Sequence, residues 1–111
     1  DKGIYTNVHD LLKFDQALYS EKLLKQETLE LAFVGRSKPK KHLNNVNYGF
    51  GFRMLEMPKT NEKIVYHNGW WKGFRAYFVR RIEREQTVII LTNVKRGPFL
   101  KVIDLVSLLP E

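Results

Sequence analysis

The second half of the chain constrains the fold most, because short alternating segments follow one another there with connections of only a few residues. Side chains alternate between the two faces of a β-strand, so a period of two predicts strands. A parallel pair needs a crossover of about a dozen residues or more, which these connections are too short to supply. The sequence therefore predicts an antiparallel sheet of about four strands. Three of them cover residues 48–55, 74–81 and 87–92, and the remaining one begins with residues 63–67.

Two of these strands have distinctive compositions. In 48–55, glycines between the aromatic residues leave one face open to close approach. The opposite face is expected to carry Tyr48, Phe50, Phe52 and Met54. The 87–92 segment is apolar at nearly every position, which is typical of a central strand covered on both faces. Residues 82–86 are polar and are expected to form a hairpin connection.

The first third of the chain has the spacing of helices instead. Residues 6–19 predict an amphipathic helix, which Thr6 or Asn7 caps by accepting a hydrogen bond from an N–H group of the first turn. Its apolar face is expected to carry Val8, Leu11, Leu12 and Leu18. A shorter helix is predicted over 26–33, ended by Gly35 in the left-handed conformation that glycine adopts cheaply.

The end of the chain predicts one more helix. Pro98 suits its first turn, where a missing N–H group costs nothing. The helix is expected to bury Leu100, Ile103, Val106 and either Leu105 or Leu109. Two helices, an antiparallel sheet and a C-terminal helix in that order predict an α+β fold.

Composition limits the class of protein further. A length of 111 residues with 43% hydrophobic and 28% charged residues predicts one globular domain. The absence of cysteine excludes disulfides and thiolate metal sites, and the three histidines lack metal-ligand spacing, so neither a metal nor a cofactor is expected. No apolar run approaches the roughly 20 residues of a transmembrane helix.

The net charge of +7 raises the question of a nucleic-acid partner. Part of the charge lies in the run 36–42, which is expected to be a solvated loop. The segment 72–74 begins like an RNA-binding strand motif, but Arg75 and Ala76 do not continue that motif, and the order of elements is wrong for it. No nucleic acid is therefore expected, although a basic module for single-stranded nucleic acid stays as an alternative.

The segment YHNGWWKGF, residues 66–74, is the strongest candidate for a functional site. A lone histidine on a strand is usually a hydrogen-bonded structural residue, and tryptophans usually pack in a core. Because side chains alternate, one of Trp70 and Trp71 is expected to point inward and the other toward a cleft. Ser37 and Lys40 match a Ser-x-x-Lys motif in letters, but no apolar helix follows, so Ser37 is not expected to be a nucleophile.

Four segments, taken in order, resemble the C-terminal part of the serine β-lactamase-related family. They are residues 1–18, 48–52, 66–74 and 88–93. That family includes class C β-lactamases, penicillin-binding proteins and related esterases and peptidases. The resemblance implies a partial β-lactamase/transpeptidase-like fold, with residues 1–111 as a single domain that is the C-terminal fragment of a larger one. It also implies a bacterial parent protein that is periplasmic, exported or attached to the membrane.

The resemblance assigns roles to the 66–74 segment. His67-Asn68-Gly69 aligns with the family's third motif, Lys-Thr-Gly or His-x-Gly. His67 then takes the place of the basic residue that faces the nucleophile, and the Trp70 N–H is one of two donors to the oxyanion. Asn68, Gly69 and Trp71 would contact the substrate. Asn68 stands where the family often has Thr or Ser, which leaves open whether the substrate is a β-lactam, a peptide or an ester.

The same resemblance places the nucleophilic serine, its lysine and the tyrosine base before Asp1. The chain alone is then expected to be inactive, and the parent to be a serine hydrolase that forms an acyl-enzyme on an amide or ester. The alternative is a non-catalytic relative that binds peptidoglycan or another ligand. Expected partners are the small-molecule or peptide substrate, the N-terminal half of the parent domain, and a second copy that pairs with an exposed sheet edge.

Overall fold

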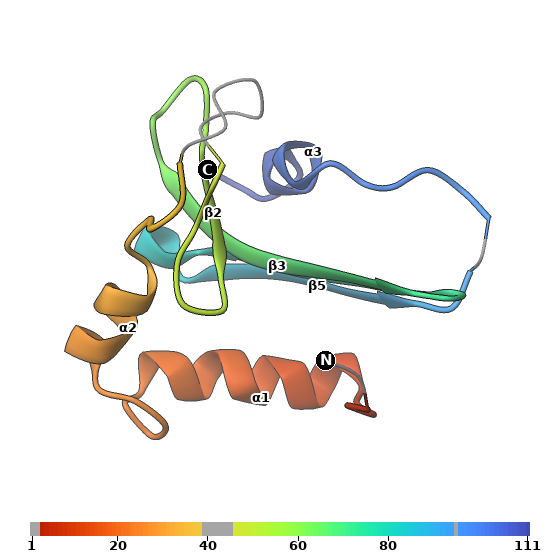
Figure 1. Ribbon diagram of the computed structural model, residues 1–111, viewed down its shortest axis with the longest axis horizontal. Coiled ribbons are helices and arrows are strands. Elements are labelled where there is room, and N and C mark those ends of the chain that lie inside the picture. Colours follow the sequence, from red (N-terminus) through yellow and green to blue (C-terminus); the bar gives the residue numbers. More distant parts are fainter. Residues whose placement is uncertain (1–2, 39–45, 95) are drawn as a thin grey trace.

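A computed structural model describes residues 3–38, 46–94 and 96–111 of the chain. It shows an antiparallel sheet with one helix on each face and a third helix beside one end (Figure 1). The order of the strands in the sheet is β1-β2-β3-β4-β5, and every neighbouring pair is antiparallel. The elements are α1 (Val8–Tyr19), α2 (Gln26–Ala32), β1 (Asn47–Tyr48), β2 (Arg53–Glu56), β3 (Lys63–Trp71), β4 (Phe74–Arg81), the 3-10 turn η2 (Ile82–Arg84), β5 (Gln86–Thr92) and α3 (Val102–Ser107).

This arrangement confirms the predicted α+β fold, with five strands where about four were expected. The extra strand arises because the predicted strand 48–55 is wrong. Tyr48 pairs with Arg53, so β1 and β2 form a tight hairpin. Gly51 reverses the chain at φ +75°, a conformation that glycine adopts without strain. Alternation of side chains does not reveal such a reversal, and Phe50, expected on the same face as Tyr48, is an exposed turn residue.

The long hairpin β3–β4 is the centre of the sheet. Its two strands pair from Val65 with Arg80 to Trp71 with Phe74, and Lys72-Gly73 form the turn. Lys72 adopts φ +52° in that turn. The predicted hairpin connection after β4 is confirmed as η2 followed by β5.

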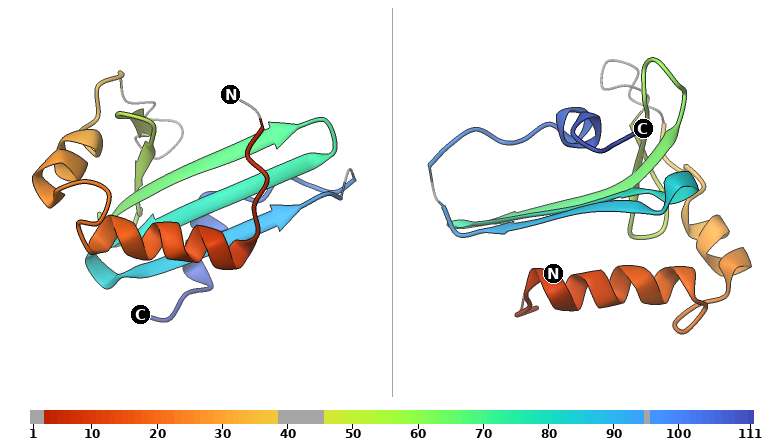
Figure 2. Two further views of the ribbon diagram at one scale, coloured as in Figure 1. Left: turned by 90° about the horizontal axis from the view of Figure 1, so that it is seen from below. Right: turned by 180° about the vertical axis from the view of Figure 1, so that it is seen from behind.

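The position of β5 differs from the prediction. It was expected in the centre of the sheet, but it lies at the edge, and all seven of its residues are half-buried. Helix α1 runs alongside it on one face (Figure 2). On the other face Val88 and Ile90 pack against the core under α3. Its apolar composition therefore reflects cover on both faces and says nothing about which strands flank it.

Two cores lie on the two faces of the sheet. The core under α3 contains Leu55, Ile64, Tyr66, Tyr77, Val79, Val102, Leu105 and Val106. The core under α1 and α2 contains Leu18, Leu29, Ala32, Phe33, Met54 and Val65. Alternate residues of β3 thus enter opposite cores, as the pleat of a strand requires. None of the helices in the described ranges is long and apolar enough to cross a membrane.

The sequence predicts one helix end correctly and two wrongly. Asn7 caps α1, and its Oδ1 accepts a 2.9 Å hydrogen bond from the Asp10 N–H. Gly35 is not left-handed, so the predicted end of α2 is wrong; a Cβ at Gly35 would instead collide with the side chain of Asn47. Pro98 does not begin the last helix, because α3 starts at Val102. Of the last-helix residues expected in the core, Leu100 is 43% exposed.

Buried ion pairs link α1 and the segments next to β3 and α3 to strand β4. Asp15 of α1 accepts a 2.6 Å hydrogen bond from Nε of Arg80, and both side chains are almost fully buried. Glu62 pairs with Arg81 at 2.8 Å, and Arg81 also donates to the carbonyl oxygen of Pro110. Removing one partner of such a pair leaves an uncompensated buried charge, which costs about 3–5 kcal/mol.

Candidate active site

The predicted site residues form the outer half of β3. Strand β2 pairs with β3 only as far as Arg53 with Tyr66, whereas β4 continues to Trp71 with Phe74. From His67 to Trp71, β4 lies along one edge of β3 and no described strand pairs with the other (Figure 2, left). All five residues of this stretch, which we call the motif strand, are exposed.

Side chains of the motif strand divide between the two faces of the sheet. Tyr66 lies in the core under α3, so alternation places Asn68 and Trp70 on the α3 side. In agreement, the Trp70 ring lies 6.4 Å from the ring of Phe99, in the segment before α3. Burial raises the pKa of Tyr66, so its hydroxyl stays protonated at neutral pH.

The expectation that one tryptophan points inward is wrong. Trp70 is 62% exposed and Trp71 is 50% exposed. The reason is that the motif strand extends beyond both cores, so neither face of it is covered by packed helices. The two rings are therefore available to line a binding surface on opposite sides of the strand.

His67 has a partner that the sequence did not suggest. Its Nε2 lies 3.1 Å from the hydroxyl oxygen of Tyr48, and the two rings meet edge to face at 6.1 Å. Tyr48 belongs to β1, the second strand over in the sheet. Its side chain can reach His67 because β2, the strand between them, pairs with β3 only as far as Tyr66. The wrong assignment of 48–55 as one strand concealed this contact, since only the hairpin brings Tyr48 back toward β3.

Tyr48 is itself held by the segment that follows α2. The Asn47 Oδ1 accepts hydrogen bonds from Ser37 N–H, Ser37 Oγ and Tyr48 N–H at 2.8–2.9 Å. The Arg36 N–H donates to the Tyr48 carbonyl oxygen at 2.9 Å. Ser37 is therefore a structural residue, as expected. Lys40 and His42 lie outside the described residues, and His9 is exposed on α1, as expected.

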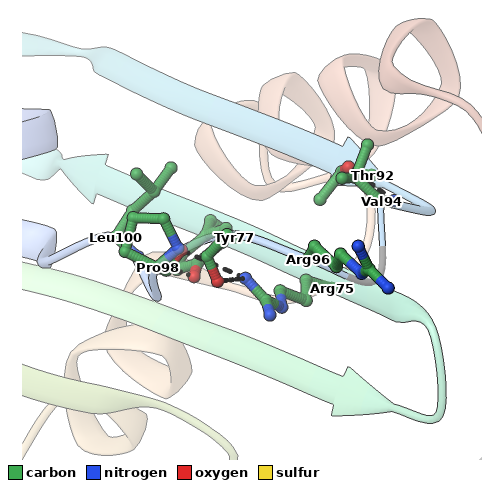
Figure 3. A pocket seen from close by; sticks show the side chains of 8 residues that line it. Arg75, Tyr77, Thr92, Val94, Arg96, Pro98 and Leu100 are labelled. Carbon is green, nitrogen blue, oxygen red and sulfur yellow. Dashed lines mark hydrogen bonds between the residues drawn. The ribbon is translucent and has the colours of Figure 1, made fainter.

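The hollow in Figure 3 lies beside the motif strand, because its lining residues Arg75 and Tyr77 of β4 pair with Trp70 and Asn68. Its volume is about 150 Å³, and its lining residues are Arg75, Tyr77, Thr92, Val94, Arg96, Gly97, Pro98 and Leu100. It is closed in part by hydrogen bonds from Arg75 Nη1 to the carbonyl oxygens of Gly97 and Pro98, at 2.9 and 3.0 Å. None of these lining residues belongs to the motif strand, and the open edge of that strand is the one opposite β4. The described part of the chain holds no group of three His, Asp or Glu residues arranged for a metal ion.

An antiparallel sheet covered by helices on both faces, with a His-Asn-Gly-Trp segment on an open strand edge, is the architecture that the family resemblance implies. Comparison with known proteins confirms the class: the family model described as Beta-lactamase matches residues 1–108, and the chain belongs to that family. It is therefore a β-lactamase-related chain.

A particular relative supports the same assignment. Penicillin-binding protein 4* of Bacillus subtilis (strain 168) is 37% identical over 96 residues, which cover 84% of this chain. The match covers 20% of that protein, so the chain spans about a fifth of the length of this curated relative. No solved structure gives a significant match.

Proposed function

We propose that the chain supplies the substrate-side strand of a serine hydrolase of the β-lactamase and penicillin-binding type. Such an enzyme forms an acyl-enzyme from an amide or ester substrate. The observation that carries the proposal is the open edge of β3 at residues 67–71, in a chain of the beta-lactamase family. Residues 1–111 would be one part of a larger domain, completed by its N-terminal half.

The register of the β3–β4 hairpin supports Trp70 as an oxyanion donor. A two-residue turn closes on Trp71 and Phe74, and the pair that flanks such a turn normally exchanges a hydrogen bond. Hydrogen-bonded and non-hydrogen-bonded pairs alternate along an antiparallel ladder, so Trp70 and Arg75 form a non-hydrogen-bonded pair. We infer that the Trp70 N–H points away from β4, toward the open edge. A donor there would stabilise the negative oxygen of a tetrahedral intermediate.

Gly69 supports a substrate that lies close to this strand. Its backbone φ is not in the left-handed region, so glycine is not needed for conformation. In the described part of the chain, a Cβ added there would meet only the Ala76 Cβ, at an ordinary 3.8 Å, so glycine is not needed for packing either. The remaining reason for glycine is external: an acyl group can lie against the backbone where no side chain projects.

The cations near the motif strand favour a negatively charged substrate. The Lys72 ammonium lies 5.9 Å from the centre of the Trp71 ring, and the Arg75 guanidinium lies 4.3 Å from that of Phe99. Cations beside the motif strand raise the local concentration of anionic ligands. We propose that His67 and Asn68 donate hydrogen bonds to the carboxylate or amide of the substrate, and that Trp71 contacts its apolar part.

The chain alone is expected to form no acyl-enzyme. Its sequence has three serines, and each hydroxyl is already engaged as a donor within the fold. Ser37 Oγ donates to Asn47 at 2.8 Å, while Ser20 and Ser107 donate to the backbone carbonyls of Ala17 and Ile103. A nucleophile needs an adjacent base instead. The nucleophile, and with it the activity, would come from the rest of the protein.

The test is acylation of the full protein by a fluorescent penicillin and by a nitrophenyl ester, read as a mass shift of the intact protein. We expect an adduct in the wild type, and an adduct formed at least about tenfold more slowly in His67→Ala, because its side chain faces the open edge. His9→Ala, which changes an exposed histidine on α1, is the matched control and should react normally.

Other outcomes decide between the alternatives. Equal rates in His67→Ala and His9→Ala would refute the role of His67. Tight binding of a peptidoglycan fragment with no adduct would replace the hydrolase by a non-catalytic relative. Binding to single-stranded nucleic acid that weakens steeply with salt would favour the nucleic-acid module.

A further inference from the structure

We infer that Tyr48 is a positioning residue, whose hydroxyl fixes the orientation and the tautomer of the His67 ring. The inference rests on the proposed function only where His67 is said to contact substrate. The contact itself is geometric, since the hydroxyl oxygen and Nε2 are 3.1 Å apart and the rings meet edge to face.

The direction of this hydrogen bond decides which nitrogen of the His67 ring carries the proton. A neutral imidazole has one N–H donor and one acceptor nitrogen, and a hydrogen bond made by one nitrogen selects the tautomer of the ring. If the Tyr48 hydroxyl donates, Nε2 is the acceptor and the ring hydrogen lies on Nδ1. Among the described residues, the Tyr48 hydroxyl is the hydrogen-bond partner of the His67 ring. The Nδ1–H is then left to donate to a ligand at the open edge.

Tyr48 is built into a rigid support, as a positioning residue requires. Its N–H and its carbonyl oxygen are both hydrogen-bonded to the segment after α2. Next to it, the Phe50 N–H donates to the Ala32 carbonyl oxygen at 3.0 Å. A Cβ on Gly49 would collide with that same oxygen, so the hairpin must have glycine there to lie against the end of α2.

The phenol ring of Tyr48 is held from another direction as well. The guanidinium of Arg53, the residue paired with Tyr48 across the hairpin, lies 5.7 Å from the centre of the ring. The ring thus has a cation on one side and His67 on another. A side chain restrained in this way can hold an imidazole in one orientation at little entropic cost.

The first experiment reads the tautomer directly. We propose measuring the imidazole nitrogen chemical shifts of the full protein labelled with ¹⁵N-histidine, with the His67 signals assigned by their loss in His67→Gln. The wild type should show Nδ1 protonated and Nε2 as the acceptor. Tyr48→Phe should lose this preference, whereas the control Tyr5→Phe, a change at a fully exposed tyrosine, should keep it. The same tautomer in Tyr48→Phe and Tyr5→Phe, or Nε2 protonated in the wild type, would overturn the inference.

A second experiment separates this inference from the proposed function. In the acylation assay, Tyr48→Phe should slow adduct formation by between about tenfold and 100-fold, with little change in the concentration of substrate that half-saturates the reaction. If His67→Ala has no effect while the tautomer still depends on Tyr48, the proposed role of His67 fails and the positioning contact stands. If His67→Ala slows acylation and Tyr48→Phe does not, the positioning role fails.

Discussion

Gly69 is the residue at which function and stability separate most clearly. Its φ is ordinary, and among the described residues an added Cβ would meet only the Ala76 Cβ, so Gly69→Ala should change the free energy of unfolding by less than about 1 kcal/mol. The added methyl group would nevertheless project from the motif strand into the space of a bound acyl group. Thermal unfolding of the variant should match the wild type, and acylation of the full protein should slow by about tenfold or more.

Gly51→Ala is the matched control for that substitution. Gly51 has φ +75° and no atom within 4 Å of an added Cβ, so alanine there should destabilise the fold by about 1 kcal/mol through the backbone alone. It calibrates the unfolding measurement only, because the turn at Gly51 also brings Tyr48 toward His67. A large loss of stability in Gly69→Ala would show that this glycine is structural, and would remove the reason for placing an acyl group against it.

How much of the site the sequence predicts also depends on the residue. The positions of Gly69 and Trp70 on a strand follow from alternation and from the family motif. The contact of His67 with Tyr48 does not, because it depends on a backbone reversal at Gly51 and on where β2 ends. Pairwise contacts across non-adjacent strands carry no local signal in the sequence.

At the scale of elements, Glu62 joins three parts of the fold. It lies just before β3 and accepts hydrogen bonds from Arg81 at the end of β4, whose Nη1 donates to Pro110 beyond α3. These hydrogen bonds hold the pKa of the Glu62 carboxylate below its usual value of 4.5. A depressed folded-state pKa gives stability that is present above the unfolded-state pKa and is lost as the pH falls through the folded-state pKa.

The resulting prediction concerns acid. The wild type should lose stability to urea as the pH falls below about 4.5, whereas Glu62→Gln should lose less over that range. At neutral pH the variant should be less stable by about 3 kcal/mol, because Arg81 keeps its charge without a charged partner. Urea midpoints measured at several pH values test both statements.

Glu83→Gln is the control for this measurement, since Glu83 is an exposed residue of η2. It should behave like the wild type at every pH. If Glu62→Gln shows the same loss on acidification as the wild type, the ion pair with Arg81 is not the source of the acid sensitivity.

The element-scale predictions from sequence fail for one physical reason. Period and composition report which faces of a segment are covered, and they do so correctly for β5, which is apolar because α1 and the core under α3 cover it. They do not report lateral order, so a central position was predicted for β5. Pro98 is a second case in which a local pattern misses a distant contact. It fits a first helical turn, but it lies in a segment whose backbone carbonyls accept hydrogen bonds from Arg75.

At the scale of the whole molecule, the chain leaves apolar and strand surfaces uncovered. No described strand pairs with the outer edge of β5, and Val8, Leu12 and Phe14 of α1 are each more than 40% exposed. An open edge beside an apolar helix face favours association. We therefore predict that the isolated chain forms dimers, and that the N-terminal half of the parent domain would occupy the same surface.

Light scattering over a tenfold or greater range of concentration tests this prediction. The mass should rise toward that of two chains, and co-expression with the preceding part of the protein should abolish the dimer. A chain that stays monomeric at every concentration would contradict it.

The proposed function depends above all on the open edge of β3, which would bind the acyl carbonyl through the N–H of Trp70. A crystal structure of the full protein acylated by a penicillin or an ester would show this contact. We predict that the acyl carbonyl oxygen lies about 2.7–3.1 Å from the Trp70 nitrogen, with the acyl chain against Gly69. An adduct whose carbonyl lies elsewhere, or a Trp70 N–H hydrogen-bonded within the sheet, would contradict the proposal.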